Sequence, residues 1–352
     1  MATDVQNKQT FFEEFENLRP IFKGMERHYS INVVPELEKL DIERANTHSG
    51  ALLGQLFIAL IGFMISVILI SVLGIFGLLF GVIFTIIIMV FVWGLQTNSF
   101  ILGAKRILIG GVVSFFDWVY SPTSVEPDIF NRLVALKLFG GFDSKDFSDK
   151  IEGIAFDREF SLTEIYLTRT ETQSTTDANG NTSTETYTVT VFNGCLISID
   201  IPQEFEGETI VLRRGFLFNP KKIKGLKKVG LVSSKFEKVL NAYGTDQVES
   251  RYLLPPTIIE QIIAYERAFK GKNVRFAFID GQLHIVVETG KRFEFKQLST
   301  STLDISRIKT LLKEIEATFN LIEGLLVKTS KDWKETFGHD AFLTKEEIIN
   351  KT

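Results

Sequence analysis

The chain has little cysteine and little histidine. Among its 352 residues there is one cysteine, which excludes an intrachain disulfide framework and any zinc site built on several cysteines. Cys195 stands in the apolar run Cys195-Leu196-Ile197, which is more typical of a small core residue than of a nucleophile. No two histidines have the spacing of an HExxH metal site, so we expect no metal and no cofactor. The histidines are His28, His48, His284 and His339.

Common catalytic signatures are also absent. There is no G-x-S-x-G nucleophile elbow, and Lys270-Gly271-Lys272 lacks the Gly-rich lead-in and the following Ser or Thr of a phosphate-binding loop. A net charge of −4 does not suggest a nucleic-acid partner. Catalytic residues are therefore unknown from the sequence, and an enzyme is the less favoured class.

The most informative absence is that of charge between residues 51 and 95, where no Asp, Glu, Lys or Arg occurs. A single straight helix of that length would measure about 67 Å, roughly twice the ~30 Å hydrocarbon core of a bilayer. Two spans of ~20 residues, folded back on each other, fit the length. The sequence therefore predicts a two-helix transmembrane hairpin over residues 51–95.

Lys and Arg flank this hairpin at both open ends, whereas the turn between the spans carries no charge. Because Lys and Arg accumulate on the cytoplasmic side of a membrane, we expect both termini in the cytoplasm. We expect no cleaved signal peptide, because the start of the chain lacks a basic segment leading into an apolar one. The flanking cations are Lys39, Arg44, Lys105, Arg106 and Arg132.

Gly77 and Gly81 form a small-x-x-x-small pair in the second span. Such a pair allows two helices to approach closely. It either packs the two spans of one hairpin together or forms a dimerisation face.

Residues 96–125 are apolar but contain Lys105, Arg106 and Asp117. A third span would bury the two cations at ~2.5–3.5 kcal/mol each on insertion scales. We therefore predict an interfacial helix over 96–125, with a helix packed into the soluble part as the alternative.

The apolar residues of the first 50 positions recur at three- and four-residue spacing, which predicts a helical arm over 1–50. Pro35 is expected to open or kink its second helix. The first apolar stripe consists of Phe11, Phe12, Phe15, Leu18 and Phe22.

From about Ile151 the pattern alternates, as expected for strands. Asn179-Gly180 and Asp280-Gly281 each lie between strand-like runs and predict tight hairpin turns. If Asn179-Gly180 is a two-residue turn, Glu171 faces Thr188 and Thr172 faces Tyr187.

Helices are predicted over 256–269 and 303–326, around the strand-like runs. The fold class is therefore α+β: a helical arm, a transmembrane hairpin, and a mostly antiparallel sheet domain with flanking helices. The predicted domains are 1–50, 51–95, 96–125, a cytosolic α+β domain over 126–328, and a polar tail over 329–352.

Four short segments of this sequence resemble a known family. They are Pro35-Glu36-Leu37-Glu38-Lys39-Leu40, Phe192-Asn193-Gly194-Cys195-Leu196, the run from Asp246 to Pro256, and the run from Phe276 to Ile285. They resemble the bacterial domain of unknown function 3137, and the resemblance covers most of residues 30–326. It implies a two-span protein of the bacterial inner membrane with a cytosolic domain. It implies no activity, because none is assigned to the family, and residues 328–352 continue past its usual end.

Two groups of residues are candidate sites. Asp246, Glu249 and Arg251 alternate along a predicted strand and, with His284, form either a polar ligand site or a structural ion-paired cluster. The second group is basic and free of acids, so it either contacts anionic lipid or forms a solvated loop. It consists of Arg213, Arg214, Lys221, Lys222, Lys224, Lys227 and Lys228.

The function predicted from these features is a membrane-anchored cytosolic binding or scaffold module. Its expected partners are the lipid bilayer, anionic lipids, a protein partner and further copies of the chain, with no nucleic acid. The alternative is an enzyme acting on a membrane-proximal substrate through the Asp246, Glu249, Arg251 and His284 cluster.

Overall fold

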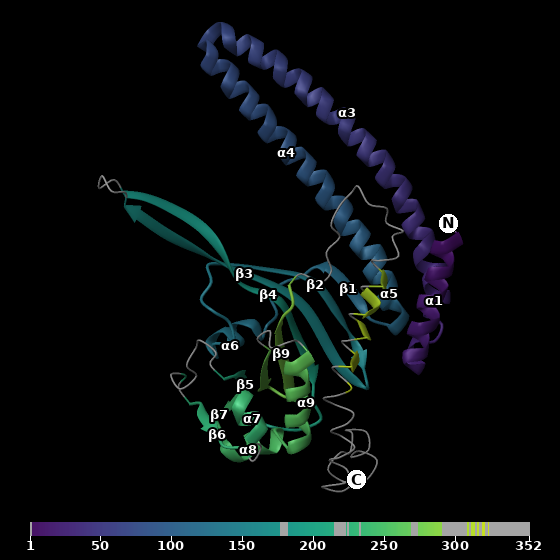
Figure 1. The fold of residues 1–352 in the computed structure, drawn as a ribbon, viewed down its shortest axis with the longest axis vertical. Coiled ribbons are helices and arrows are strands. Elements are labelled where there is room, and N and C mark those ends of the chain that lie inside the picture. The colour runs from purple at the N-terminus through teal and green to yellow at the C-terminus, as the bar shows by residue number, and fades with distance from the viewer. Residues whose placement is uncertain are drawn as a thin grey trace. The chain divides into compact units, whose positions relative to one another are not determined.

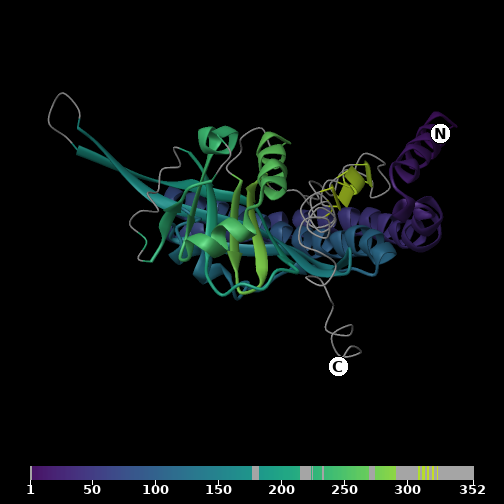
Figure 2. The same cartoon turned by 90° about the horizontal axis from the view of Figure 1, so that it is seen from below.

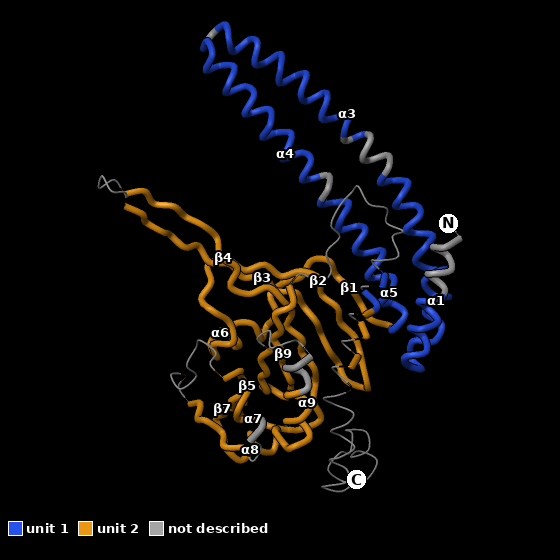
Figure 3. Tube along the Cα trace, in the orientation of Figure 1, with its two compact units in different colours: residues 1–116, 293–312 blue, residues 117–292, 313–352 orange. Residues whose placement is uncertain are grey.

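The structure is a computed structural model that describes residues 2–176, 182–214, 223, 225–231, 234–268 and 274–290, together with separate residues between 308 and 323. The chain divides into two compact units. Unit 1 comprises residues 1–116 and 293–312, and unit 2 comprises residues 117–292 and 313–352 (Figure 3).

Unit 1 begins with five helical segments, α1 (Ala2–Leu18), η1 (Pro20–Phe22), α2 (Met25–His28), η2 (Tyr29–Val33) and α3 (Val34–Leu73). The predicted apolar stripe is buried at Phe12, Phe15 and Phe22, whereas Leu18 is 53% exposed. The rings of Phe15 and Phe22 stack with centroids 4.4 Å apart. Aromatic packing thus holds the first helices together as far as Phe22, and Leu18 is the exposed member of the predicted stripe.

Pro35 lies in the first turn of α3, directly after the π-helical turn η2. Proline has no N–H to donate to the preceding turn, and a wider turn is a common way to accommodate it. The chain therefore remains helical across Pro35, and α3 runs without interruption from the charged arm into the apolar segment.

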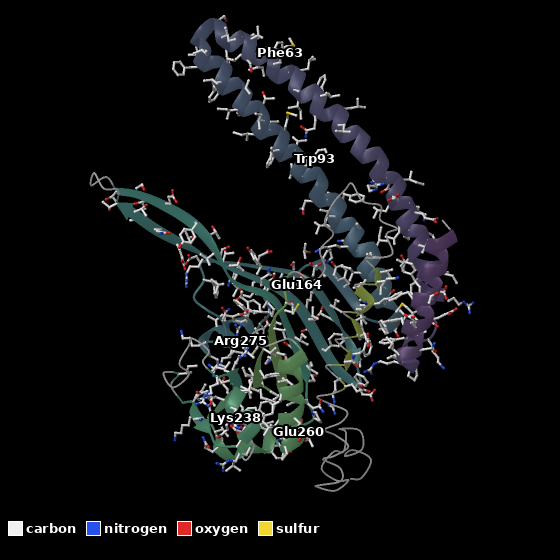
Figure 4. All side chains as sticks on the ribbon, in the orientation of Figure 1. Phe63, Trp93, Glu164, Lys238, Glu260 and Arg275 are labelled. Carbon is white, nitrogen blue, oxygen red and sulfur yellow. The ribbon has the colours of Figure 1, made fainter. Side chains whose placement is uncertain are left out.

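Helices α3 and α4 (Ile75–Lys105) form the predicted hairpin, reversing at Gly74, whose φ is 61° (Figure 1). Residues Leu52–Ser71 and the helical run from Ile75 are both long and apolar enough to cross a membrane. Their large side chains point outward, as Phe63 illustrates with 69% exposure (Figure 4). Helices that expose apolar side chains in this way need an apolar surrounding, such as hydrocarbon.

Glycines bring α3 and α4 into contact. A Cβ atom at Gly62 would lie 2.1 Å from Oγ1 of Thr85, and one at Gly81 would lie 2.4 Å from Oγ of Ser66. A Cβ atom at Gly77 would meet the backbone of Leu69. The Gly77 and Gly81 pair therefore packs the two helices of one chain together, which favours the intrachain alternative over a dimerisation face.

The segment after α4 is helical only as far as residue 116. It comprises η3 (Arg106–Gly110), α5 (Gly111–Val113) and η4 (Ser114–Phe116), and it contacts the first helices: the Gly111 carbonyl oxygen lies 2.7 Å from Nε2 of His28. Val119–Thr123 is strand β1, so the helix predicted through residue 125 is wrong at its C-terminal end. Pairing of β1 with β2 explains the difference, because the edge of a sheet stabilises an extended segment.

In its described residues, unit 2 is built on one nine-stranded antiparallel sheet in the order β1-β2-β3-β4-β9-β8-β5-β7-β6 (Figures 1 and 2). The α+β class with a mostly antiparallel sheet is therefore confirmed. The remaining strands are β2 (Ser144–Ala155), β3 (Arg158–Thr176), β4 (Thr182–Asp200), β5 (Thr209–Arg213), β6 (Lys227–Val229), β7 (Leu240–Gly244), β8 (Arg275–Ile279) and β9 (Gln282–Glu288). The helices are α6 (Phe130–Ala135), α7 (Ser234–Val239), α8 (Gln247–Leu253) and α9 (Pro256–Ala268).

The Asp280-Gly281 turn is confirmed between β8 and β9, and both of its residues have positive φ angles, 51° and 74°. Phe156-Asp157 makes the same kind of turn between β2 and β3, with φ angles of 53° and 58°. Asp is tolerated at such angles but Phe is not a turn residue, so this hairpin has no clear sequence signal.

The core of unit 2 lies against the middle of the sheet. Phe130 and Leu133 of α6 pack on Phe192 and Leu196 of β4 and are all at most 2% exposed. Helix α9 buries Ile259, Ile262 and Ile263, while Phe269 lies outside the described residues. The described residues between 308 and 323 are helical, as predicted, but Leu303 and Leu326 lie outside the description.

We predict that Gly81→Leu lowers the free energy of unfolding by roughly 1–3 kcal/mol, the usual cost of overpacking. The added side chain has no room beside Ser66. Heat unfolding in detergent measures the effect. Gly94→Leu is the matched control in α4, because nothing lies within 4 Å of its Cβ position. Equal destabilisation by both variants would contradict glycine-mediated packing.

Candidate functional site

The Asp246, Glu249 and Arg251 segment is a helix, so its predicted alternation along a strand is wrong. Asp246 caps α8, and its side chain accepts hydrogen bonds from the backbone N–H of Val248 (2.7 Å) and of Glu249 (2.8 Å). An Asp three residues before Glu is a helix-start signal. That signal was available in the sequence.

The side chains of Glu249 and Arg251 also form hydrogen bonds with backbone groups. The Glu249 carboxylate accepts hydrogen bonds from the N–H groups of Glu206 and Gly207, both 2.8 Å long. Arg251 donates from Nε to the Gly230 carbonyl oxygen at 3.1 Å. These contacts tie α8 to neighbouring loops, which supports the structural interpretation of the cluster.

His284 lies on β9 and is 1% exposed. Its Nδ1 is 2.9 Å from Oγ of Ser198 on the adjacent strand β4. Burial lowers the pKa of His284 to about 4, although the Ile279 carbonyl and the Asp280 and Asp200 carboxylates oppose the shift. The imidazole is therefore neutral at pH 7.

His284 ends a polar row that crosses four strands of the sheet. Glu152 faces Ser161, Ser161 faces Ser198, and Ser198 faces His284. The row lines a groove of about 750 Å³. The cations of the groove are paired: Arg132 with Glu208, and Lys150 with Glu152 at 2.6 Å.

Arg251 lines a different hollow, of about 290 Å³, with Leu254, Pro255 and Ile259. Neither hollow is lined by Asp246 or Glu249. The structure therefore does not bring the four predicted residues together in either one.

The described part of the basic group is spread along β7. Arg213 of β5 faces Leu240 at one end of β7, and Lys227 of β6 faces Gly244 at the other end. Arg213, Arg214, Lys227 and Lys228 are exposed. Lys221, Lys222 and Lys224 lie outside the described residues, so the group is only partly placed.

The outer part of the β3–β4 hairpin, residues 168–176 and 182–190, is here called the β-arm. Its Ser- and Thr-rich strands predict a polar arm that projects into solvent, but they do not predict its observed register. In both views of the ribbon the β-arm extends beyond the other strands of the sheet (Figures 1 and 2). The observed register pairs Glu171 with Tyr187 and Thr172 with Thr186, one residue away from the predicted register. The last pair is Thr176 and Thr182, and the predicted Asn179-Gly180 turn lies outside the described residues.

The one-residue difference decides what each face of the β-arm displays. Cross-strand partners share a face, and side chains alternate along a strand. In the observed register every pair on one face joins two hydroxyl residues, and all of them are exposed except Thr168, which is half-buried. The pairs of this hydroxyl face are Thr168–Thr190, Thr170–Thr188, Thr172–Thr186, Ser174–Thr184 and Thr176–Thr182.

The opposite face of the β-arm carries a polar cluster. The Tyr187 hydroxyl donates to Oε2 of Glu171 at 3.1 Å, and Arg169 forms an ion pair with the same carboxylate. The hydrogen bonds from Arg169 and Tyr187 lower the pKa of Glu171. The hydroxyl face, by contrast, carries no charge. A threonine at every second position from 182 to 190 was its signal in the sequence.

Comparison with known proteins finds a family model that matches part of this chain. Residues 190–326 match the family model described as "Protein of unknown function (DUF3137)", which confirms the resemblance over that part of the chain. No curated protein matches the chain. A solved structure, the crystal structure of the mycobacterial trehalose monomycolate transport factor A, TtfA, matches with 9% identity and a TM-score of 0.31. The match covers 63% of this chain and 96% of that chain, and a similarity this low supports no conclusion about function.

We predict that the free energy of unfolding falls by about 2 kcal/mol as pH is lowered from 7 to 4.5 through His284 alone. Its pKa is about 4 in the folded protein and 6.5 in the unfolded chain, so the unfolded chain binds the extra proton in this window. Urea unfolding in detergent at pH 7 and pH 4.5 measures the effect. The difference between the two pH values should be smaller for His284→Gln by this amount, and equal differences would contradict the assignment.

Proposed function

We propose, from the premise that residues 190–326 belong to the DUF3137 family, that this protein is a membrane-anchored binding or scaffold module. Its α3–α4 hairpin is the anchor, and the β-arm of unit 2 contacts a protein partner. The activity is binding rather than catalysis.

In this proposal the anchor lies in the bacterial inner membrane and both termini lie in the cytoplasm. The apolar parts of α3 and α4 have the length of a hydrocarbon core, and their exposed side chains need an apolar surrounding. Lys39 and Arg44 precede the hairpin and Lys105 follows it, which supports a cytoplasmic location of both open ends.

The observation that carries the binding proposal is the exposure of the β-arm. Residues 172–176 and 182–188 are exposed on both faces of a two-stranded ribbon. A two-stranded ribbon is marginally stable in water, and open strand edges pair readily with another chain. Extended ribbons of this kind bind partners by main-chain hydrogen bonds, with side chains supplying selectivity.

The contacts of Asp246, Glu249 and His284 argue against the enzyme alternative. One carboxylate oxygen of Asp246 and both carboxylate oxygens of Glu249 accept hydrogen bonds from backbone N–H groups, and His284 is buried and neutral. A catalytic acid or base needs access to a substrate proton. Structural roles explain these side chains without a reaction.

The test of the protein partner is copurification from native membranes, read by mass spectrometry. Replacing residues 173–185 by Asn-Gly joins Thr172 and Thr186 through a tight turn and removes the outer β-arm. We expect this variant to lose partners that the native chain captures, while its melting temperature stays the same. Thr175→Ser, on the charged face, is the control and should keep them. An unchanged set of partners would overturn the proposal.

A second contact, with anionic lipid, is favoured by the exposure of Lys227 and Lys228 on the edge strand β6. Near an anionic surface each such cation contributes ~1 kcal/mol to the free energy of membrane binding. The full chain is placed in nanodiscs with and without anionic lipid, and the rate of lysine modification is measured by mass spectrometry. We expect Lys228 to be modified several-fold more slowly in nanodiscs that contain anionic lipid than in those that do not. The rate at the exposed Lys137 is the reference in both. Equal rates at Lys228 in both lipids would remove this contact.

A further inference from the structure

The two outer edges of the β-arm differ. At its base, the β3 edge is closed by Asp143, whose backbone N–H donates to the Thr168 carbonyl oxygen and whose carboxylate accepts from the Thr170 N–H. The β4 edge has no such closure among the described residues, since β4 pairs with β9 only from Gly194 onward. The β4 edge is therefore open from residue 182 to residue 190.

Between residues 182 and 190 this open edge has little of the usual protection against pairing. Natural edge strands are guarded by proline, by bulges, by short length or by inward charges. Residues 182–190 contain no proline and one charged residue, Glu185, and five of the nine are threonine, which favours strands. An edge of this kind is suited to a second strand.

We propose that the occupant of this edge is the same edge of a second copy of the chain. The two β4 strands pair antiparallel about a two-fold axis at Thr186. This inference rests on the proposed function, in which the β-arm is the contact surface, and it names the partner.

The sequence of the edge is complementary to itself in this register. Each residue faces the one at the same distance on the other side of Thr186, so Thr182 faces Thr190 and Thr184 faces Thr188 of the second copy. Glu185 then faces Tyr187, the same pair of residue types that bonds within the β-arm between Glu171 and Tyr187. No like charges face each other, which is the main penalty in such pairs.

The register also preserves the faces of the sheet. Residues that face each other are both even-numbered or both odd-numbered, so the hydroxyl faces of the two copies join into one four-stranded surface. A register shifted by one residue places threonines opposite Glu185 and Tyr187 and breaks this surface. Anchoring both copies in one membrane raises their effective concentration, which favours pairing through a short interface.

The test is disulfide cross-linking of the full chain in its membrane, in a Cys195→Ala background, because Cys195 is the single native cysteine. Thr186→Cys places two cysteines directly opposite each other, where antiparallel Cα atoms are ~4.5–5.5 Å apart, within disulfide range. Thr172→Cys is the matched control: it faces Thr186 on the same hydroxyl face, but on β3. Its copies would be about 14 Å apart across three strand spacings, too far for a disulfide.

We expect roughly tenfold more linked dimer from Thr186→Cys than from Thr172→Cys, given these distances. Chains carrying Thr184→Cys should link to chains carrying Thr188→Cys when the two are expressed together, and neither should link alone. Equal linking at Thr172 and Thr186, or none at Thr186, overturns the inference. If the Thr186→Cys chains fail to link while partner capture still depends on the β-arm, that result overturns only the second copy as the occupant of the edge. The proposed function then stands.

Discussion

The pairing of β3 with β4 is the constraint on which unit 2 depends. It runs from Phe160 and Ile199 in the core to Thr176 and Thr182 at the end of the β-arm. The register that buries Leu162 and Ile197 in the core, together with one bulge beyond it, sets which side chains share a face in the β-arm. A core packed at crystal-like density leaves the register no freedom within the core.

The bulge between Leu167 and Thr168 lies where the core ends and the β-arm begins. A bulge adds one residue to one strand and increases the local twist. Here it shifts the partner of Thr168 to Thr190, and from that point threonine meets threonine in every second pair. A small irregularity thus separates an apolar, buried ladder from a polar, exposed one on the same two strands.

In the hairpin of unit 1, the backbone hydrogen bonds are formed within each helix, and small residues allow the two helices to come into contact. Ser66 donates to the Gly62 carbonyl oxygen at 2.8 Å and Thr85 to the Gly81 carbonyl oxygen at 2.7 Å, so their hydroxyls need no water. Gln55 donates to the Met89 carbonyl oxygen at 3.0 Å and links the two helices. The few polar groups of the hairpin therefore serve its own packing.

The sequence by itself determined the features that arise from local pattern: the uncharged run of α3 and α4, the Asp280-Gly281 turn, the apolar stripe of α9 and the α+β class. These follow from hydropathy, from turn residues with positive φ and from helical periodicity, all of which act within a few residues. Only the tertiary structure decided that Glu249 ties α8 to the loop at Glu206 and Gly207, that His284 is buried beside Ser198, and that the threonines of β3 and β4 pair on one face. Each of these depends on cross-strand register or on contacts between residues far apart in the chain, and local pattern does not contain that information.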